Sequence, residues 1–245
     1  MSAAATLSGI IVPMTGKPKK PPIDKKAVVA RLARAQEHQL LVHVRRWVPD
    51  SDGLEGFVVG IGKKWVVLQR LSYRIAFEGW QLLRLKDIQA VSIDPDADCF
   101  EVKALKARAL WPPTTPELHL DDVVGALQSA ASATTVISVF DEFDRPDVCW
   151  IGAVTSVDES KLQLLEVNTR GGWARKARSF DPADVTRLEF GGGYEEALSL
   201  VAGPPPGLAD EFVPHVDAAL TDPVLRGAEH AVESRLDIGP ETPST

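Results

Sequence analysis

The chain has 245 residues, of which 44% are hydrophobic and 25% are charged, a composition typical of a globular protein with one large or two small domains. It contains no apolar run of about 18 residues, and its first residues lack the basic start of a signal peptide. We therefore expect neither a membrane span nor a signal peptide, and a cytoplasmic location. Cys99 and Cys149 lie outside any CxxC pattern, so we expect reduced thiols.

The net charge of −7 is unevenly distributed along the chain. Residues 1–110 hold 18 Lys and Arg against 11 Asp and Glu, a balance of +7, whereas residues 111–245 hold 9 against 23, a balance of −14. Such polarity is typical of proteins that offer a basic face to a polyanion or pair head to tail with their own copies. A basic domain followed by an acidic domain and tail, with no partner implied, is the alternative.

The first part of the chain predicts an arm, a helix and several short strands. Residues 1–22 are expected to form a flexible arm, because the prolines of GKPKKPP prevent a regular helix. A helix is predicted over residues 25–38, with Asp24 as its N-cap. Alternating or continuous apolar runs predict strands, and a second helix follows them. These strands cover residues 40–47, 55–61, 65–71 and 81–93, the last divided at Lys86-Asp87, and the helix covers residues 99–110.

The rest of the chain predicts a second set of the same elements. Residues 111–118 form a proline-rich linker, which divides a first unit (23–110) from a second unit (119–203). The second unit is predicted to begin with a helix over residues 121–132, to continue with short strands and to end in a helix that stops at Gly203. Residues 204–245 are expected to form an acidic, proline-containing tail.

The two units are related by an internal repeat. Residues 56–71 align with residues 152–167 without a gap when Gly56 is placed on Gly152. Residues 87–93 then align with 184–190 after one inserted residue, and residues 42–44 align with 137–139. A repeat of this length indicates a duplicated supersecondary unit. The glycine at the start of each aligned segment is typical of a strand that bends sharply in a small barrel.

The spacing of these residues resembles the Sm-like family. Its first motif places a glycine in strand 2, an apolar residue two positions later, an aspartate six positions later and apolar residues through strand 3. The second unit fits this spacing with Gly152, Val154, Asp158, Leu162 and Leu164, and the first with Gly56, Val58, Val66 and Leu68, although Gly62 replaces the aspartate. The resemblance implies a mainly β fold with flanking helices (α+β), made of two tandem five-stranded Sm-like or SH3-like small barrels, each preceded and followed by a helix.

The residues with which Sm proteins bind RNA are not kept. The asparagine that follows the motif aspartate by four positions is replaced by Val66 and Leu162. The Arg-Gly pair before strand 5 is replaced by Lys86-Asp87 and Ala183-Asp184. The resemblance therefore supplies a fold and no binding site.

The loop after the third strand of each unit is the best candidate for a nucleic-acid site, because cations neutralise phosphates and an aromatic ring stacks on bases. Together with the neighbouring hairpin turn, these loops offer Lys63, Lys64, Arg70, Tyr73, Arg74, Arg170, Trp173, Arg175, Lys176 and Arg178. A solvated loop whose tryptophan folds back on its own unit is the alternative.

Other patterns do not indicate a site. The acidic turn at residues 141–147 lacks the glycine and the terminal glutamate of a calcium loop, and the five histidines show no HxxxH or HExxH spacing. The glycines at 191–193 are followed by two glutamates, which would repel an anion. We expect no catalytic site, cofactor or metal.

Two functions remain as hypotheses. The first is a non-enzymatic scaffold or protein-interaction module, which binds a protein partner or assembles with its own copies through exposed strand edges. The second is a protein that binds single-stranded RNA through the basic loops. We expect no interaction with a membrane and no small-molecule substrate.

Overall fold

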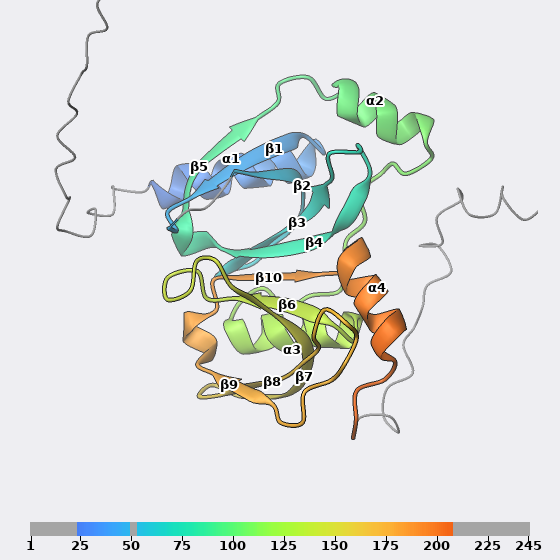
Figure 1. The fold of residues 1–245 in the computed structure, drawn as a ribbon. Coiled ribbons are helices and arrows are strands. Elements are labelled where there is room, and N and C mark those ends of the chain that lie inside the picture. Colours follow the sequence, from blue (N-terminus) through green and yellow to red (C-terminus); the bar gives the residue numbers. More distant parts are fainter. Residues whose placement is uncertain (1–23, 50–52, 208–245) are drawn as a thin grey trace, which may run out of the picture.

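Residues 24–49 and 53–207 are described by the structure, a computed structural model, so the predicted arm and most of the predicted tail lie outside the described residues. The fold is mainly β, with a ten-stranded antiparallel sheet and flanking helices (Figure 1). None of the helices in the described residues is long and apolar enough to cross a membrane.

The elements follow each other in two similar series, which we call the first and the second unit. The first unit consists of α1 (Lys25–Glu37), β1 (Leu41–Arg46), β2 (Leu54–Ile61), β3 (Trp65–Leu71), β4 (Phe77–Arg84), the 3₁₀ helix η1 (Leu85–Asp87), β5 (Ile88–Ile93) and α2 (Phe100–Ala107). The second unit consists of α3 (Val123–Ala133), β6 (Ile137–Phe140), β7 (Cys149–Val157), β8 (Leu162–Glu166), β9 (Arg178–Phe180), the 3₁₀ helix η2 (Pro182–Asp184), β10 (Arg187–Phe190) and α4 (Gly193–Ala202).

The predicted first helix is confirmed together with its cap. Asp24 Oδ1 accepts a hydrogen bond of 3.0 Å from the backbone N–H of Ala27, which satisfies one of the free donors at the start of α1. Val28, Leu32 and Ala35 recur on one face and are buried. This face covers the core of the first unit, which also takes in Val42, Val58, Leu68 and Leu83.

The predicted repeat is present in the strand register. Gly56 pairs with Arg70 between β2 and β3, and Gly152 pairs with Glu166 between β7 and β8. In both hairpins the glycine and its partner are separated by the same number of residues. The register of both hairpins is also interrupted at the same place, after Val58 and after Val154. A Cβ at either glycine would overlap a carbonyl oxygen of the neighbouring strand. Only glycine therefore permits this approach of the strands.

The predicted pair of closed barrels is not confirmed. The strand order is β5-β1-β2-β3-β4 in the first unit and β10-β6-β7-β8-β9 in the second, which is the same order twice. Strand β4 does not close on its own unit but pairs with β10, in a register that joins Leu83 to Arg187 and Trp80 to Phe190. The hydrogen-bonding edge of β4 is satisfied by the second unit, and the result is one open, continuous sheet.

The contact between β4 and β10, which we call the joint of the two units, has an apolar side to which both units contribute. Successive residues of a strand face opposite sides of the sheet, so Leu83 lies in the core under α1 while Leu82 faces the other side. There Val59, Trp65 and Val67 of the first unit share one core with Leu127, Val139, Leu164 and Leu188 of the second. Leu120 and Val123, at the start of the second unit, pack against this core.

A buried ion pair crosses the joint as well. The Arg46 guanidinium on β1 donates two hydrogen bonds of 2.7 Å to the two oxygens of Glu142, which follows β6. The hydroxyl of Thr186 lies 2.6 Å from Glu142 Oε2. Burial opposes the charge of Glu142, but the hydrogen bonds and charges of Arg46, Thr186 and Arg187 keep the pKa of this carboxyl below its ordinary value.

Two local expectations differ from the structure. Strand β9 forms inside the segment that was expected to be one long basic loop, because Arg178 and its neighbours pair with β8. Strand β4 begins at Phe77, four residues before the strand that was predicted to begin at residue 81. Both strands lie at an edge of their unit. Each forms because it pairs with a neighbouring strand, and its own sequence shows no clear apolar pattern.

Candidate interaction surface at α4

The predicted loop residues of the first unit are partly engaged with carboxylates. Arg70 Nη2 lies 3.2 Å from Glu78 Oε2, and Arg70 Nη1 lies 3.6 Å from Glu189 Oε2 on β10. Tyr73 and Arg74 are exposed at the β3–β4 turn, where Arg108 of the same unit donates hydrogen bonds to the carbonyl oxygens of Arg74 and Ile75. This turn is therefore braced against the segment after α2.

The two lysines of the β2–β3 turn face the second unit. Lys63 Nζ lies 2.7 Å from Asp121 Oδ2, and this hydrogen bond raises the pKa of the ammonium group and lowers that of the carboxyl. Both side chains are exposed, so the pair contributes little to stability. The backbone N–H groups of Lys64 and Trp65 donate to the carbonyl oxygen of Leu120, which fixes the turn against the start of the second unit.

The predicted tryptophan of the second unit folds back on its own unit. Trp173 is half-buried, and its Nε1 donates a hydrogen bond of 3.2 Å to the carbonyl oxygen of Ala202 in α4. Its ring packs beside Val167 and Leu198. Trp173 thus folds back on its own unit, as the alternative expectation had it.

The cations of the same loop differ from one another. Arg178 lies on β9 and forms an ion pair with Glu166 on β8. Arg170, Arg175 and Lys176 are exposed, and they form no ion pair within the part of the chain that the structure describes. The structure thus divides the predicted set into neutralised cations and available cations.

Helix α4 carries an exposed apolar stripe that the sequence did not single out. Tyr194, Leu200 and Val201 are 52%, 85% and 72% exposed, and Ala197 lies between them on the outer face. The opposite face holds Leu198, which is buried. Because apolar residues occupy both faces of α4, the sequence has no amphipathic pattern that would have marked the outer face.

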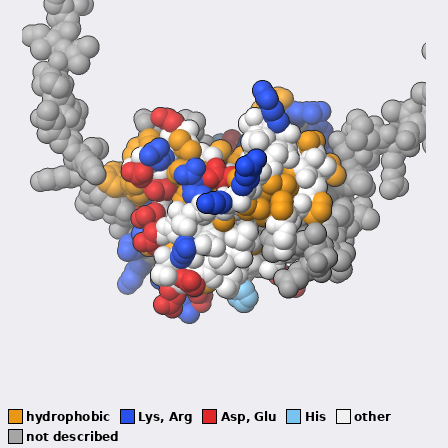
Figure 2. Space-filling view, turned by 60° about the horizontal axis from the view of Figure 1, so that its bottom comes forward, with side chains coloured by type: hydrophobic (Ala, Val, Ile, Leu, Met, Phe, Trp, Pro, Cys, Tyr) orange, Lys and Arg blue, Asp and Glu red, His pale blue; other side chains and the backbone are white. Residues whose placement is uncertain are grey.

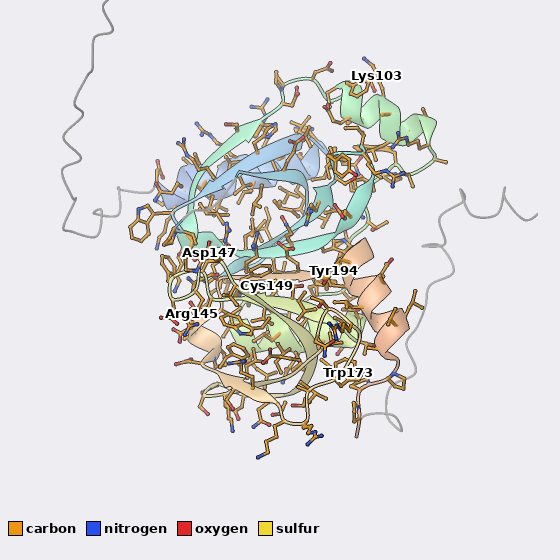
Figure 3. The ribbon with its side chains drawn as sticks, viewed as in Figure 1. Lys103, Arg145, Asp147, Cys149, Trp173 and Tyr194 are labelled. Atoms are coloured by element: carbon orange, nitrogen blue, oxygen red, sulfur yellow. The ribbon has the colours of Figure 1, made fainter. Side chains whose placement is uncertain are left out.

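The basic loop and the α4 stripe are contiguous. A Cβ at Gly171 would lie 2.6 Å from Val201 Cγ1, which places the loop directly on the last turn of α4. In Figure 3, Tyr194 lies near the start of α4 and Trp173 near its end. On the face that Figure 2 brings forward, hydrophobic side chains gather next to Lys and Arg side chains, on the side where α4 lies in Figure 1. We define the α4 surface as Arg170, Arg175, Lys176, Tyr194, Leu200 and Val201.

Comparisons with protein-family models, with characterised proteins and with solved structures find no match. Within the described residues, no group of three or more His, Cys, Asp or Glu side chains could hold a metal ion. The chemistry of the chain must therefore be inferred from its own surfaces.

Proposed function

We propose that the protein is a non-enzymatic interaction module, whose α4 surface binds an acidic protein segment that carries apolar side chains. One observation supports this most: Leu200 and Val201 are among the most exposed large apolar residues, and the loop that reaches Val201 carries three exposed cations with no carboxylate partner among the described residues. An apolar patch bordered by charge is typical of a protein-binding surface. The cations select the charge of the partner, and the apolar stripe supplies the buried contact.

A partner protein suits the free surfaces better than a further copy of this chain. At the β4–β10 joint, Arg187 and Glu189 project from β10, whereas Ala90 and Ser92 occupy the corresponding places on β5, the free edge of the first unit. If a second copy placed its β5 next to β9 of the first copy, the contact between the copies would lack these two charges. It would also meet a short strand of three residues.

We also propose that each unit is an opened Sm-like barrel. The repeated strand order, the motif glycines Gly56 and Gly152 and the pairing of a fourth strand with the fifth strand of the next unit support this. In Sm-like proteins these two edges pair between subunits. Here the pairing takes place within one chain.

Binding of single-stranded RNA remains the alternative proposal, and the exposed cations favour it. Lys64, Arg74, Arg170, Arg175 and Lys176 are exposed and could contact phosphates. Against this, Lys63, Arg70 and Arg178 already face carboxylates, and Trp173 packs on α4. Tyr73 is 94% exposed, whereas Trp173 is half-buried.

A binding assay separates the two proposals. We would titrate the full chain against a labelled helical peptide with one glutamate face and one leucine face, a scrambled peptide of the same composition and a uridine 20-mer. Fluorescence anisotropy would be measured at low and at physiological salt. Under the interaction proposal, the ordered peptide binds best and retains affinity at physiological salt. Under the alternative, the RNA binds best, with a steep salt dependence.

Matched variants identify the surface. Leu200→Ser/Val201→Ser should weaken peptide binding by about tenfold or more and leave RNA binding unchanged, since it removes only apolar contacts. Arg175→Glu/Lys176→Glu should weaken both, whereas Lys103→Glu on α2, far from α4 in Figure 3, should change neither. Peptide affinity that survives the Leu200→Ser/Val201→Ser change would overturn the assignment of this surface.

A further inference from the structure

A cavity of about 640 Å³ lies between the two units, and none of the residues of the α4 surface lines it. Five segments form it: α1, the β2–β3 turn, the end of β4 with η1, the start of α3, and η2. Its lining includes Lys25, Val29, Lys64, Arg84, Leu85 and Val123. A cavity of this size is in the range of small-molecule sites, and sites between units are frequent.

The lining combines an apolar floor with cations. Val29 is 40% exposed and Leu85 and Val123 are partly exposed, so these side chains offer the apolar surface of the cavity, which the buried Trp65 and Val185 complete. Four lysines and one arginine complete the lining, to which no Asp or Glu contributes. Such a cavity suits an organic anion with an apolar body, because the floor removes the body from water while the cations neutralise its head.

One of the cations is held in place by the protein. Arg84 is 7% exposed, and its Nε donates a hydrogen bond of 2.6 Å to Asp87 Oδ2 while its Nη1 donates one of 3.0 Å to the carbonyl oxygen of Ala183. Asp87 balances the charge of Arg84, but a guanidinium has five N–H donors, so these two bonds fix its position and leave N–H donors rather than a free charge for a ligand. The acceptor of the second bond, Ala183, belongs to the second unit, so the contact between the units helps to position this cation.

Two further cations are available at the opening. Lys25 and Lys64 are exposed and form no ion pair among the residues that the structure describes. Lys63 is held by Asp121, but this exposed pair is weak. Residues 1–23, which precede Lys25, hold three lysines and no Asp or Glu, so their charge does not favour them as occupants of the cavity.

We propose that this cavity binds a small amphipathic anion, a carboxylate or phosphate monoester on an acyl or aryl body, with the head at Lys25, Lys64 and Arg84 and the body on Val29, Leu85 and Val123. Because both units line the cavity, a bound anion would also strengthen their contact. The site does not depend on the α4 surface and goes beyond the proposed interaction.

Dodecanoate and dodecyl phosphate, each below its critical micelle concentration, are the probes for this site. Binding to the full chain would be measured by calorimetry and by the fluorescence of tryptophan, since Trp65 lines the cavity. We expect both anions to bind with one site per chain, and acetate, inorganic phosphate and dodecyltrimethylammonium to bind at least about tenfold more weakly. Equal affinity for the cationic amphiphile would overturn the proposal.

Variants and a second form of the ligand complete the test. Lys64→Glu should lower the affinity for dodecanoate by about tenfold, and Ala183→Trp should abolish it by filling the cavity without removing a charge, whereas Lys103→Glu and Leu200→Ser/Val201→Ser should leave it unchanged. Vesicles of anionic phospholipid test whether the anion can come from a lipid surface: retention with vesicles supports a membrane source, and binding of monomers alone supports a free ligand. Affinity that persists in both Lys64→Glu and Ala183→Trp would show that the anion binds elsewhere.

Discussion

Arg46 and Glu142 place two opposite charges inside the joint of the two units. Their side chains are 1% and 6% exposed, and two parallel hydrogen bonds connect them. The geometry compensates much of the cost of removing both charges from water. Loss of either partner would leave the other charge buried, so the pair makes the correct joint strongly preferred over a misaligned one.

We predict that Glu142→Gln lowers the free energy of unfolding by about 3 to 5 kcal/mol at neutral pH, because the Arg46 charge would stay buried without its carboxylate. The folded pKa of Glu142 lies below the ordinary value of 4.5, so its stabilisation is present above that value and is lost as the pH falls through the folded pKa. The difference between the two proteins should therefore shrink in acid. Urea denaturation over a range of pH measures it.

Glu159→Gln is the matched control for this change, since Glu159 is exposed and should alter stability by less than about 0.5 kcal/mol. A Glu142→Gln protein as stable as the control at neutral pH would contradict the role given to the pair.

A substitution at Gly152 tests whether the close approach of β7 and β8 requires glycine. We predict that Gly152→Ala destabilises the protein by about 1 to 3 kcal/mol or more, because the new Cβ overlaps the carbonyl oxygen of Leu165 and the strands must separate. Gly193→Ala has no atom within 4 Å of the new Cβ and should be neutral or slightly stabilising at the start of α4. Thermal denaturation of both variants measures this difference, and equal melting temperatures would exclude the steric explanation.

At the scale of elements, helix α4 separates a structural face from a binding face. Leu198 is 6% exposed and packs with Trp173, whereas Leu200 is 85% exposed. The same substitution at two positions of one helix can therefore distinguish stability from binding.

We predict that Leu198→Ala lowers the free energy of unfolding by about 2 to 5 kcal/mol, because it leaves a cavity under α4. Leu200→Ala should change stability by less than about 0.5 kcal/mol and weaken peptide binding. Chemical denaturation and anisotropy measure the two effects, and a large loss of stability in Leu200→Ala would mean that its exposed position is part of the fold.

The elements also show what a sequence can predict. The repeat and its register were readable because Gly56 and Gly152 mark equivalent bends and apolar residues recur around them. Strand β9 was not readable, since it has three residues and depends on β8 for its pairing. No pattern in the candidate loops could tell that Arg178 lies on β9 and faces Glu166, or that Trp173 reaches Ala202, because these contacts depend on the tertiary fold.

On the scale of the whole molecule, the acidic tail is the natural competitor of any acidic partner. Residues 208–245 contain eight Asp and Glu against two Arg, and they follow α4, which carries the apolar stripe, by a few residues. We expect this segment to compete with an acidic partner for the α4 surface, because a short connection along the chain raises the effective concentration of a tethered ligand.

We predict that a chain ending at Gly207 binds the acidic peptide several-fold more tightly than the full chain, with the larger difference at low salt, where charge attraction between the tail and the surface is strongest. Anisotropy titrations of both proteins measure this. The same affinity for both at low salt would mean that the tail does not occupy the surface.

The joint also requires the two units to follow each other in one order along the chain. Val59, Trp65 and Val67 are buried against the second unit, and the residues at the equivalent positions of that unit are Thr155, Lys161 and Gln163. If the order of the two halves were reversed in the gene, the three apolar side chains would face water, and a lysine would be forced into the contact. The duplicated halves have thus become complementary rather than interchangeable, and their order along the chain is as much a part of the fold as their sequences.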